Sequence, residues 1–269
     1  MAKRQTGWTE SKISRYIKEG RGQGDLSFYK PWLTIQDVPS KGRVHRFIGW
    51  KTARQHHLLS DLEFNYHCLC DWAENVIDIR EQFPLDRALT LKIAEDLSIK
   101  HPIDIKTGTP IVMTTDCFLT MREGDSVVYK ARTLKYEKDL NDERVIEKFE
   151  LERAYWEQQG IDFAIVTEKE LPITFISNLK FIRDAYFIND NETLTLLMEE
   201  WNRFTGSVIT NLQAFDMKYN FEVGTGISLY KHALAKKLLK VNMHEKISLN
   251  EDVSNVMVTA VSDSKKRWA

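Results

Sequence analysis

Apolar and polar positions in the first 170 residues follow the spacings of a mixed α/β domain. Apolar residues three or four positions apart predict helices over 9–19, 60–75 and 141–159. Runs rich in apolar and β-branched residues predict strands at 76–79, 111–121, 126–136 and 162–167, with a turn at 82–84 after the first strand. The two middle strands flank a turn at 123–125 and should form a hairpin. This order predicts a mixed sheet flanked by helices.

Two of these helices carry recognisable start signals. Ser60 and Glu63 have the S-x-x-E spacing of a capping box, which places Glu63 in the first turn of its helix. Asn141 is the expected cap of the long helix, and Gly160 is its expected end. Glu63 therefore has a structural explanation before any chemical one.

After Pro172 the strand pattern fades and helical spacing takes over. Helices are predicted over 175–187, 191–204 and 228–240, followed by two short strand-like pieces at 241–244 and 246–249. The two pieces would form a wing after a helix-turn-helix. We therefore expect a mixed-sheet domain at 1–170 and a mainly helical domain at 171–269.

The composition fits a folded protein of the cytoplasm. With 269 residues, 42% of them hydrophobic, the chain can bury a substantial core. Its longest apolar run is four residues, whereas a membrane-spanning helix needs about twenty. The first ten residues lack the apolar core of a secretory signal. Cys68, Cys70 and Cys117 are too few and too clustered for a disulfide framework, and we expect them to be reduced.

The net charge of −1 hides an uneven distribution along the chain. Residues 1–60 hold 12 Lys and Arg against 4 Asp and Glu, whereas residues 61–170 hold 14 against 24. A basic segment of this kind brings a chain onto a phosphate backbone. Between residues 29 and 52, aromatic residues alternate with basic ones, as in a loop or ribbon that lies on DNA. The candidate DNA-binding residues there are Arg43, Arg46 and Lys51.

A glycine-rich stretch at 20–24, GRGQG, precedes this region. It has neither the glycine spacing nor the Lys-Ser/Thr ending of a phosphate-binding P-loop. We therefore expect a flexible basic loop there.

The acidic middle of the chain holds a candidate site for metal-dependent phosphodiester hydrolysis. This chemistry needs carboxylate ligands for one or two Mg²⁺ ions and usually a lysine beside the phosphate. Asp116 lies on the first strand of the predicted hairpin, Lys135 on the returning strand, and Glu63 on the preceding helix. Each also has a structural alternative: a capping residue for Glu63, a strand-end residue for Asp116, and a solvated edge lysine for Lys135. The residues alone leave both interpretations open.

Six blocks, in order along the chain, resemble a known family. They are GRGQG (20–24), PWLTIQDVPS (31–40), GRVHR (42–46), HHLLSDLE (56–63), DIREQFPL (78–85) and DERVIEKFELERAYW (142–156). The blocks resemble TnsA, the endonuclease subunit of the heteromeric transposases of Tn-seven-like bacterial transposons. The likeness runs from about residue 20 to residue 166 and is looser past residue 171.

The resemblance implies a restriction-endonuclease-like N-terminal domain and a winged-helix-like C-terminal domain. It also implies that Glu63, Asp116 and Lys135 are catalytic, and that Mg²⁺, with Mn²⁺ as a substitute, is held mainly by Glu63 and Asp116. Thr133 stands where related nucleases carry a carboxylate or glutamine and would be a weak ligand, so the Leu134 carbonyl, water and the scissile phosphate should complete the coordination. Glu152, at a further acidic position of the family, is either a support for the site or a solvated helix residue.

The function that the resemblance implies is Mg²⁺-dependent cleavage of the non-transferred DNA strand at the 5′ ends of a transposon. Its partners would be transposon-end DNA, the TnsB transposase, which would cut and join the 3′ ends, and the AAA+ regulator TnsC, bound through the C-terminal domain. The alternative is a non-catalytic DNA-binding assembly subunit with a metal site weakened by Thr133. Neither function involves a membrane.

Overall fold

The computed structural model describes residues 7–38 and 42–259, and the chain divides into two compact units between Leu171 and Pro172. The first unit contains every candidate catalytic residue, and the second is mainly helical. Among the described residues, no helix is both long enough and apolar enough to cross a membrane.

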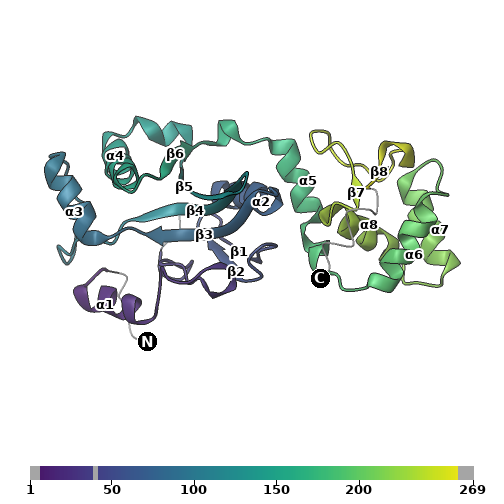
Figure 1. Cartoon of the computed structure of the whole chain (residues 1–269), viewed down its shortest axis with the longest axis horizontal. Coiled ribbons are helices and arrows are strands. Elements are labelled where there is room, and N and C mark those ends of the chain that lie inside the picture. The colour runs from purple at the N-terminus through teal and green to yellow at the C-terminus, as the bar shows by residue number, and fades with distance from the viewer. Residues whose placement is uncertain (1–6, 39–41, 260–269) are drawn as a thin grey trace. The chain divides into compact units, whose positions relative to one another are not determined.

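The first unit is built on a four-stranded mixed sheet (Figure 1). Its strands, in spatial order, are β3 (Val76–Pro84), β4 (Thr114–Glu123), β5 (Ser126–Leu134) and β6 (Asp162–Val166). β4 is antiparallel to both β3 and β5, whereas β6 is parallel to β5. A parallel pair needs a crossover connection, which contains the helix α4 (Glu143–Gln158). The predicted mixed sheet with flanking helices is confirmed.

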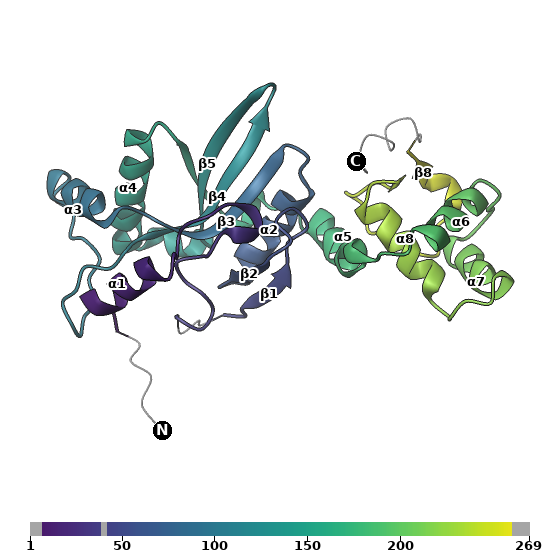
Figure 2. The ribbon, with the colours of Figure 1, turned by 60° about the horizontal axis from the view of Figure 1, so that its bottom comes forward.

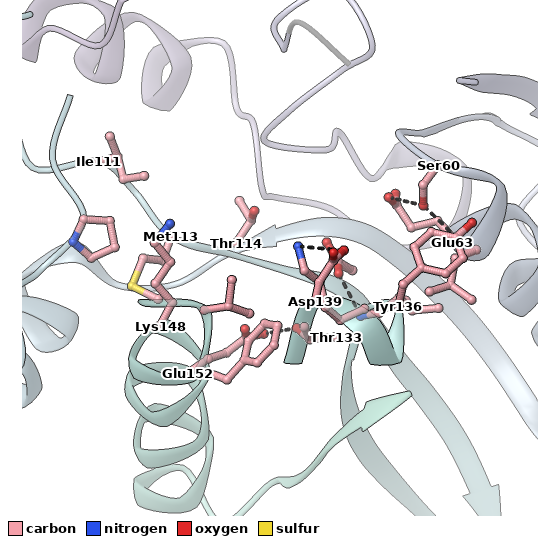
Figure 3. Close-up of a pocket in the computed structure, with 17 residues that line it drawn as sticks. Ser60, Glu63, Ile111, Met113, Thr114, Thr133, Tyr136, Asp139, Lys148 and Glu152 are labelled. Carbon is pink, nitrogen blue, oxygen red and sulfur yellow. Dashed lines mark hydrogen bonds and ion pairs between the residues drawn. The ribbon is translucent and has the colours of Figure 1, made fainter. Parts of the chain in front are cut away.

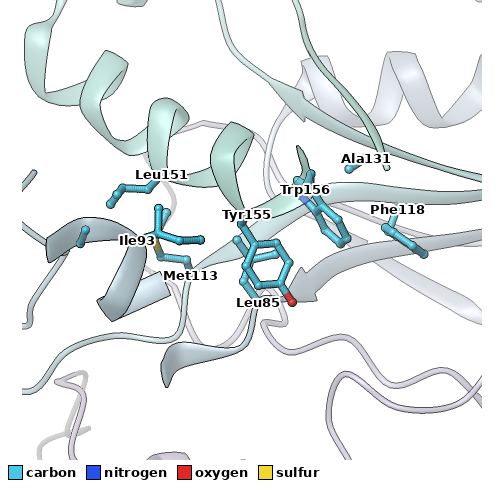
Figure 4. Close-up of a cluster of buried hydrophobic side chains, with 9 residues drawn as sticks. Leu85, Ile93, Met113, Phe118, Ala131, Leu151, Tyr155 and Trp156 are labelled. Carbon is cyan, nitrogen blue, oxygen red and sulfur yellow. The ribbon is translucent and has the colours of Figure 1, made fainter. Parts of the chain in front are cut away.

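The main core lies between the sheet and two helices, α4 and α3 (Arg87–Asp96) (Figure 4). Its buried side chains are Leu85, Ile93, Ala94, Met113, Phe118, Ala131, Leu151, Tyr155 and Trp156. The rings of Phe118 on β4 and Trp156 on α4 stack with centroids 5.0 Å apart, which fixes the helix against the strand. α3 was not predicted, because it buries only a narrow face.

β3 continues through 82–84, so the turn predicted there is wrong. Phe83 still pairs with Thr115 of β4, which keeps the segment in the sheet. Gln82 has a φ of +49°, a left-handed conformation that bends the strand without ending it.

The cap of the long helix also differs from the prediction. Asp142, rather than Asn141, accepts the backbone amide protons of Arg144 and Val145. Asn141 instead ends a short 3-10 helix that precedes α4. The predicted end at Gly160, with a φ of +66°, is consistent with the last helical residue being Gln158.

The basic N-terminal segment folds onto the first unit. Its helix, α1 (Glu10–Lys18), confirms the helix predicted over 9–19, and Thr9 is its N-terminal cap. One face of the helix packs in a small cluster made of Ile13, Tyr16, Trp32 and Val112. Within the described residues, this helix therefore packs against the rest of the first unit through that cluster.

Backbone hydrogen bonds define the glycine-rich loop at 20–24, so the prediction of a flexible loop is wrong. The Gly22 amide donates to the Lys30 carbonyl (2.6 Å), and the Lys30 amide donates to the Gln23 carbonyl (3.1 Å). Gly22 has a φ of +78°, and a Cβ atom there would lie 2.2 Å from the ring of Pro84. Both the conformation and the contact therefore require glycine.

The end of the region predicted as a loop or ribbon, 29–52, contributes the first strand of a short antiparallel hairpin that continues beyond it. The hairpin consists of β1 (His45–Ile48) and β2 (Gln55–Leu58), and β2 contacts the helix α2 (Asp61–Trp72) (Figure 2). The first unit therefore carries a second, smaller sheet beside the helix that holds Glu63.

Arg54, at the end of the turn between β1 and β2, is buried. Its guanidinium donates two hydrogen bonds to the Glu81 carboxylate of β3, at 2.7 and 2.5 Å, and His56 Nδ1 lies 2.8 Å from the same carboxylate. A buried charge needs such a partner. Arg54 therefore belongs to the internal structure, although the charge count included it in the basic segment.

The second unit has the element order of a winged helix preceded by one further helix. Its elements are α5 (Ile173–Arg183), α6 (Asn191–Trp201), α7 (Val208–Lys218), α8 (Thr225–Ala235), and the two-residue strands β7 (Leu239–Lys240) and β8 (Met257–Val258), which pair with each other. α8 is the central helix, because it contacts α5, α6 and α7. The predicted helical character is confirmed, whereas α7 was not predicted and α8 ends five residues before the expected 240.

Residues 241–249 form turns, so the two strands predicted there are wrong. Asn178 of α5 is buried and donates to the carbonyls of Met243 (3.0 Å) and Glu245 (2.7 Å). Its side-chain oxygen accepts the Ile247 amide proton (3.0 Å). One side chain thus makes hydrogen bonds with three backbone groups of the segment. In a strand, such groups would pair with the backbone of a neighbouring strand.

Asp37 links the N-terminal helix to the loop that follows it. Its carboxylate accepts hydrogen bonds from the Tyr16 hydroxyl (2.6 Å), the Arg21 guanidinium (2.7 Å) and the Thr34 amide and hydroxyl. Burial opposes ionisation, but the hydrogen bonds from Tyr16, Thr34 and Arg21 outweigh it and lower the pKa of Asp37 to about 2. The ionised form therefore stabilises the fold.

Because the pKa of Asp37 is lower in the folded state than in the unfolded chain, its contribution is complete at neutral pH and is lost as the pH falls from about 4 to about 2. We expect Asp37→Asn to lower the free energy of unfolding at pH 7 by roughly 2 kcal/mol. The variant should also lose part of the acid dependence in that window. Urea unfolding at several pH values measures both effects, with Asp125→Asn, in an exposed turn, as the control. Equal acid dependence in Asp37→Asn and wild type would contradict this assignment.

Candidate active site

Glu63 lies in the first turn of α2, held by the cap that the sequence predicts. The Ser60 hydroxyl accepts the Glu63 amide proton (3.1 Å) and donates to one oxygen of its carboxylate (2.9 Å). The Leu59 amide donates to the other oxygen (2.9 Å). The carboxylate is buried and lines a cavity of the first unit (Figure 3). The capping role therefore leaves the carboxylate at the cavity wall, where it can also act chemically.

Asp116 lies where β4 and β5 separate. The last paired residues of the two strands are Cys117 and Arg132. One residue further, Asp116 Oδ2 accepts the Leu134 amide proton (2.8 Å), so a side chain replaces a backbone acceptor. Asp116 Oδ1 accepts a hydrogen bond from the side-chain amide of Gln82 on β3 (3.1 Å). Asp116 is thus fixed from both neighbouring strands.

The two carboxyl groups are close enough to affect each other's ionisation. Burial raises the pKa of Glu63 to about 8, and the negative charge of Asp116 adds to the shift. Burial also raises the pKa of Asp116, against the opposing effects of its hydrogen bonds and of Lys135. Excess negative charge in a cavity of low dielectric constant favours a bound cation.

The available ligands suit a hard divalent cation. Mg²⁺ is commonly held by one or two carboxylates together with water and substrate phosphate oxygens. Glu63 and Asp116 supply two such carboxylates. In the part of the chain that the structure describes, no cluster of three or more His, Cys, Asp or Glu side chains could hold a metal ion. A metal here would thus depend on water, backbone carbonyls and substrate for its remaining ligands.

Lys135 directly follows β5 and lines the same cavity. Its backbone amide donates to the Val166 carbonyl of β6 (3.1 Å), which fixes where the side chain leaves the sheet. Its ammonium nitrogen lies 3.9 Å from Asp139 Oδ2. The structure therefore brings Glu63, Asp116 and Lys135 to one cavity, and it adds Asp139, which the sequence analysis did not foresee.

Glu152 is buried, so its interpretation as a solvated helix residue is wrong. The hydroxyls of Thr115 (2.6 Å) and Thr133 (2.5 Å) both donate to the same Glu152 oxygen. Trp156 Nε1 donates to the Thr115 hydroxyl (2.7 Å), which completes a chain of hydrogen bonds from α4 into the sheet. Burial raises the pKa of Glu152 to about 8. The Thr133 hydroxyl proton is thus committed to Glu152, and only its oxygen lone pair could face a metal.

The cavity has a volume of about 420 Å³. Its polar lining consists of Ser60, Glu63, Thr114, Asp116, Thr133, Lys135, Tyr136, Asp139, Lys148 and Glu152. Its apolar lining consists of Leu62, Pro102, Ile111, Met113, Leu134, Val145 and Phe149. The cavity therefore combines the acidic and basic groups that hydrolysis needs with several apolar side chains.

The three candidate DNA-binding residues lie beside α2 and do not line the cavity. Arg43 Nε is 3.1 Å from Asp61 in the first turn of α2. Arg46 is exposed on β1, and the amide of Lys51, in the turn after β1, donates to Asp71 of α2 (3.3 Å). The same helix thus contacts the basic hairpin and carries Glu63.

Gln82 is a site residue that the sequence analysis missed. Its side-chain amide donates to Asp116, and its side-chain oxygen accepts a hydrogen bond from the Thr114 hydroxyl (3.0 Å). Its backbone carbonyl accepts the Trp32 amide proton (3.2 Å). Gln82 lies within the block DIREQFPL, so the signal was present, but the segment was interpreted as a turn.

Comparisons with known proteins cover both units. A family model described as "TnsA-like endonuclease N terminal" matches residues 73–168, and one described as "TnsA endonuclease C terminal" matches residues 170–243. The chain is also 37% identical over 259 residues to the Escherichia coli protein "Transposon Tn7 transposition protein TnsA", with 93% of each chain covered.

A mixed α/β unit with these matches is that of a DNA endonuclease. The chain belongs to the TnsA family and is an endonuclease subunit of a transposase, acting on DNA with other transposition proteins. Membership implies dependence on a divalent metal ion. The resemblance inferred from the six sequence blocks is confirmed.

The two hydrogen bonds of Gln82 predict that it orients Asp116 for metal binding. Gln82→Leu removes the donor to Asp116 at similar volume, a loss of roughly 1 kcal/mol. We expect about a fivefold increase in the Mg²⁺ concentration needed for half-maximal DNA cleavage, with a smaller change in the rate at saturating Mg²⁺. Gln158→Leu, on an exposed part of α4, is the control. An unchanged Mg²⁺ dependence in Gln82→Leu would exclude the orienting role.

Proposed function

We propose that this chain hydrolyses the non-transferred DNA strand at the 5′ ends of a transposon, in the bacterial cytoplasm, with Mg²⁺ or, as a substitute, Mn²⁺. TnsB would cut and join the 3′ ends, so that the two subunits together excise the element. One observation supports this function above the others: Glu63 and Asp116, from a helix and a strand, line one cavity with Lys135.

Five residues that line the cavity have a part in this proposal. Glu63 and Asp116 hold the metal, with the Leu134 carbonyl and Thr133 as further oxygen ligands. When bound, Mg²⁺ supplies a Lewis acid that polarises the phosphate and lowers the pKa of a water molecule. Lys135 donates hydrogen bonds to the phosphate or the attacking water and offsets the negative charge that develops on the phosphate oxygens.

Glu152 has a supporting role in this proposal. It accepts hydrogen bonds from Thr115 and Thr133, the neighbours of Asp116 and Leu134 in sequence. By fixing these two threonines, it keeps the ends of β4 and β5 at the separation that admits the Asp116 side chain. It is therefore a positioning residue.

The less favoured function is a non-catalytic assembly subunit that binds DNA but does not cut it. Thr133 is the feature that favours it, because a hydroxyl is a weaker metal ligand than a carboxylate. Against it stands the burial of two carboxyl groups beside a lysine, an arrangement that destabilises a protein unless something binds there. We also propose that the second unit binds TnsC.

The catalytic proposal predicts loss of 5′-end cutting in three variants. Asp116→Ala, Lys135→Ala and Glu63→Gln should each reduce cleavage of the non-transferred strand at least a thousandfold, roughly 4 kcal/mol of activation free energy, while DNA binding and 3′-end joining by TnsB persist. Strand-mapped cleavage of an end-labelled transposon end, with TnsB and with Mg²⁺ or Ca²⁺, measures this loss.

The matched controls for charge are Asp125→Ala and Lys130→Ala, which lie on the hairpin away from the cavity. Both should cut at the wild-type rate. If Asp116→Ala cuts the 5′ ends normally, or if wild type leaves the 5′ ends uncut while TnsB joins the 3′ ends, the assembly function replaces the catalytic one.

The basic residues in and just before the hairpin β1–β2 predict a salt-dependent contact with the DNA backbone. Replacing Arg43, Arg46 and Lys51 together by alanine should weaken binding to all DNA sequences alike. It should flatten the dependence of log affinity on log salt by up to about three units, about one for each lost phosphate contact. Fluorescence anisotropy at several salt concentrations measures the slope. Removing Lys130, Arg153 and Lys169, which pair with surface glutamates, is the charge-matched control. Equal slopes in the two triple variants would place the DNA surface elsewhere.

A further inference from the structure

α4 carries two apolar stripes, and only one of them belongs to the core. Leu151, Tyr155 and Trp156 pack in the main core cluster. Val145 and Phe149, four residues apart and therefore on one face of the helix, line the catalytic cavity instead. Packing of the fold thus explains the first stripe and leaves the second facing open space.

Further apolar residues line the same cavity. They are Pro102, Ile111 and Met113, from the segment between α3 and β4. Figure 3 shows Ile111 and Met113 at one end of the cavity, with Lys148, and Ser60 and Glu63 at the other end. The cavity therefore has one end with Ser60 and Glu63, and another end where the apolar side chains lie together with Lys148 and Glu152 of α4.

An intact DNA duplex offers little flat apolar surface beside the scissile phosphate. Its outer surface consists of sugars and charged phosphates, and its bases are stacked inside. A base that has left the stack presents a flat apolar face, which proteins commonly cover with an aromatic ring. Phe149 supplies a ring, and Lys148, three residues apart from Val145 on the same helix face, supplies a cation for a neighbouring phosphate.

We infer that the end of the cavity with the apolar side chains binds the base of a nucleotide that flanks the scissile phosphate, turned out of the duplex. Phe149 stacks on this base, and Ile111 and Met113 enclose it. This inference rests on the proposed function, because it takes the end with Glu63 as the place of the scissile phosphate. The cavity is continuous between the two ends, so one nucleotide can reach both.

The inference predicts that Phe149 and the base act on cleavage together. We expect Phe149→Ala to slow single-turnover cleavage of normal DNA about tenfold, the range typical of one lost base–aromatic contact. On DNA with an abasic site at the flanking nucleotide, the same substitution should change the rate less than twofold. The assay uses the full chain with its partner transposase and end-labelled transposon-end DNA.

Ile146→Ala is the control on the same helix, because Ile146 is exposed and does not line the cavity. An abasic site five nucleotides away is the control for the DNA. Equal slowing of both substrates by Phe149→Ala would overturn the inference. A wild-type complex that cuts neither substrate would instead overturn the proposed function.

A second measurement needs no variant of the protein. 2-Aminopurine placed at either nucleotide flanking the scissile phosphate should change its fluorescence at least twofold when the wild-type complex forms with Ca²⁺. The same probe three nucleotides further into the duplex should not change. No change at either flanking position would overturn the inference even if Phe149→Ala fails to fold.

Discussion

Two carboxyl groups that the fold buries together, Glu63 and Asp116, set the central constraint on this molecule. Burial raises the pKa of both groups, and the charge of Asp116 raises the pKa of Glu63 further. Replacing both groups by apolar residues of similar volume would be expected to stabilise the fold. Neighbouring elements hold both groups in place. Glu63 is part of the N-terminal cap of α2. β4 and β5 separate at Asp116, and its side chain replaces a backbone acceptor there.

A second buried charge shows how the frame around the pair is kept rigid. Glu81 on β3 has a pKa well below its usual value because, despite burial, His56 and Arg54 favour its ionised form. This ion pair joins the hairpin β1–β2 to the sheet one residue before Gln82, which holds Asp116. The hairpin β1–β2, the strand β3 and the Asp116 carboxylate are thus joined by a continuous series of side-chain hydrogen bonds and chain neighbours.

Local signals in the sequence were enough for much of this architecture. The capping box at Ser60, the hairpin around 123–125 and the long helix before Gly160 follow from spacing and turn chemistry within a few residues. Three of the failures have a common cause, which is that a distant partner decides the structure. The local pattern predicts a turn at Gln82, but pairing with β4 keeps this segment in the sheet. The local pattern also predicts strands within 241–249, but hydrogen bonds with the side chain of Asn178 take the place of a strand partner. The burial of Glu152 likewise depends on two threonines from other elements.

The central position of α8 in the second unit leaves little of this helix accessible for contacts with DNA. In a winged-helix protein the last helix before the wing normally enters the major groove and contacts base edges. Here Leu229, Tyr230, Ala233 and Leu234 of that helix are buried. The side chain of Lys231 lies over the ring of Phe181, 4.0 Å from its centroid. The unit therefore has the element order of a winged helix, but it covers most of its last helix with its own side chains and leaves Ser228 as the exposed position along that helix.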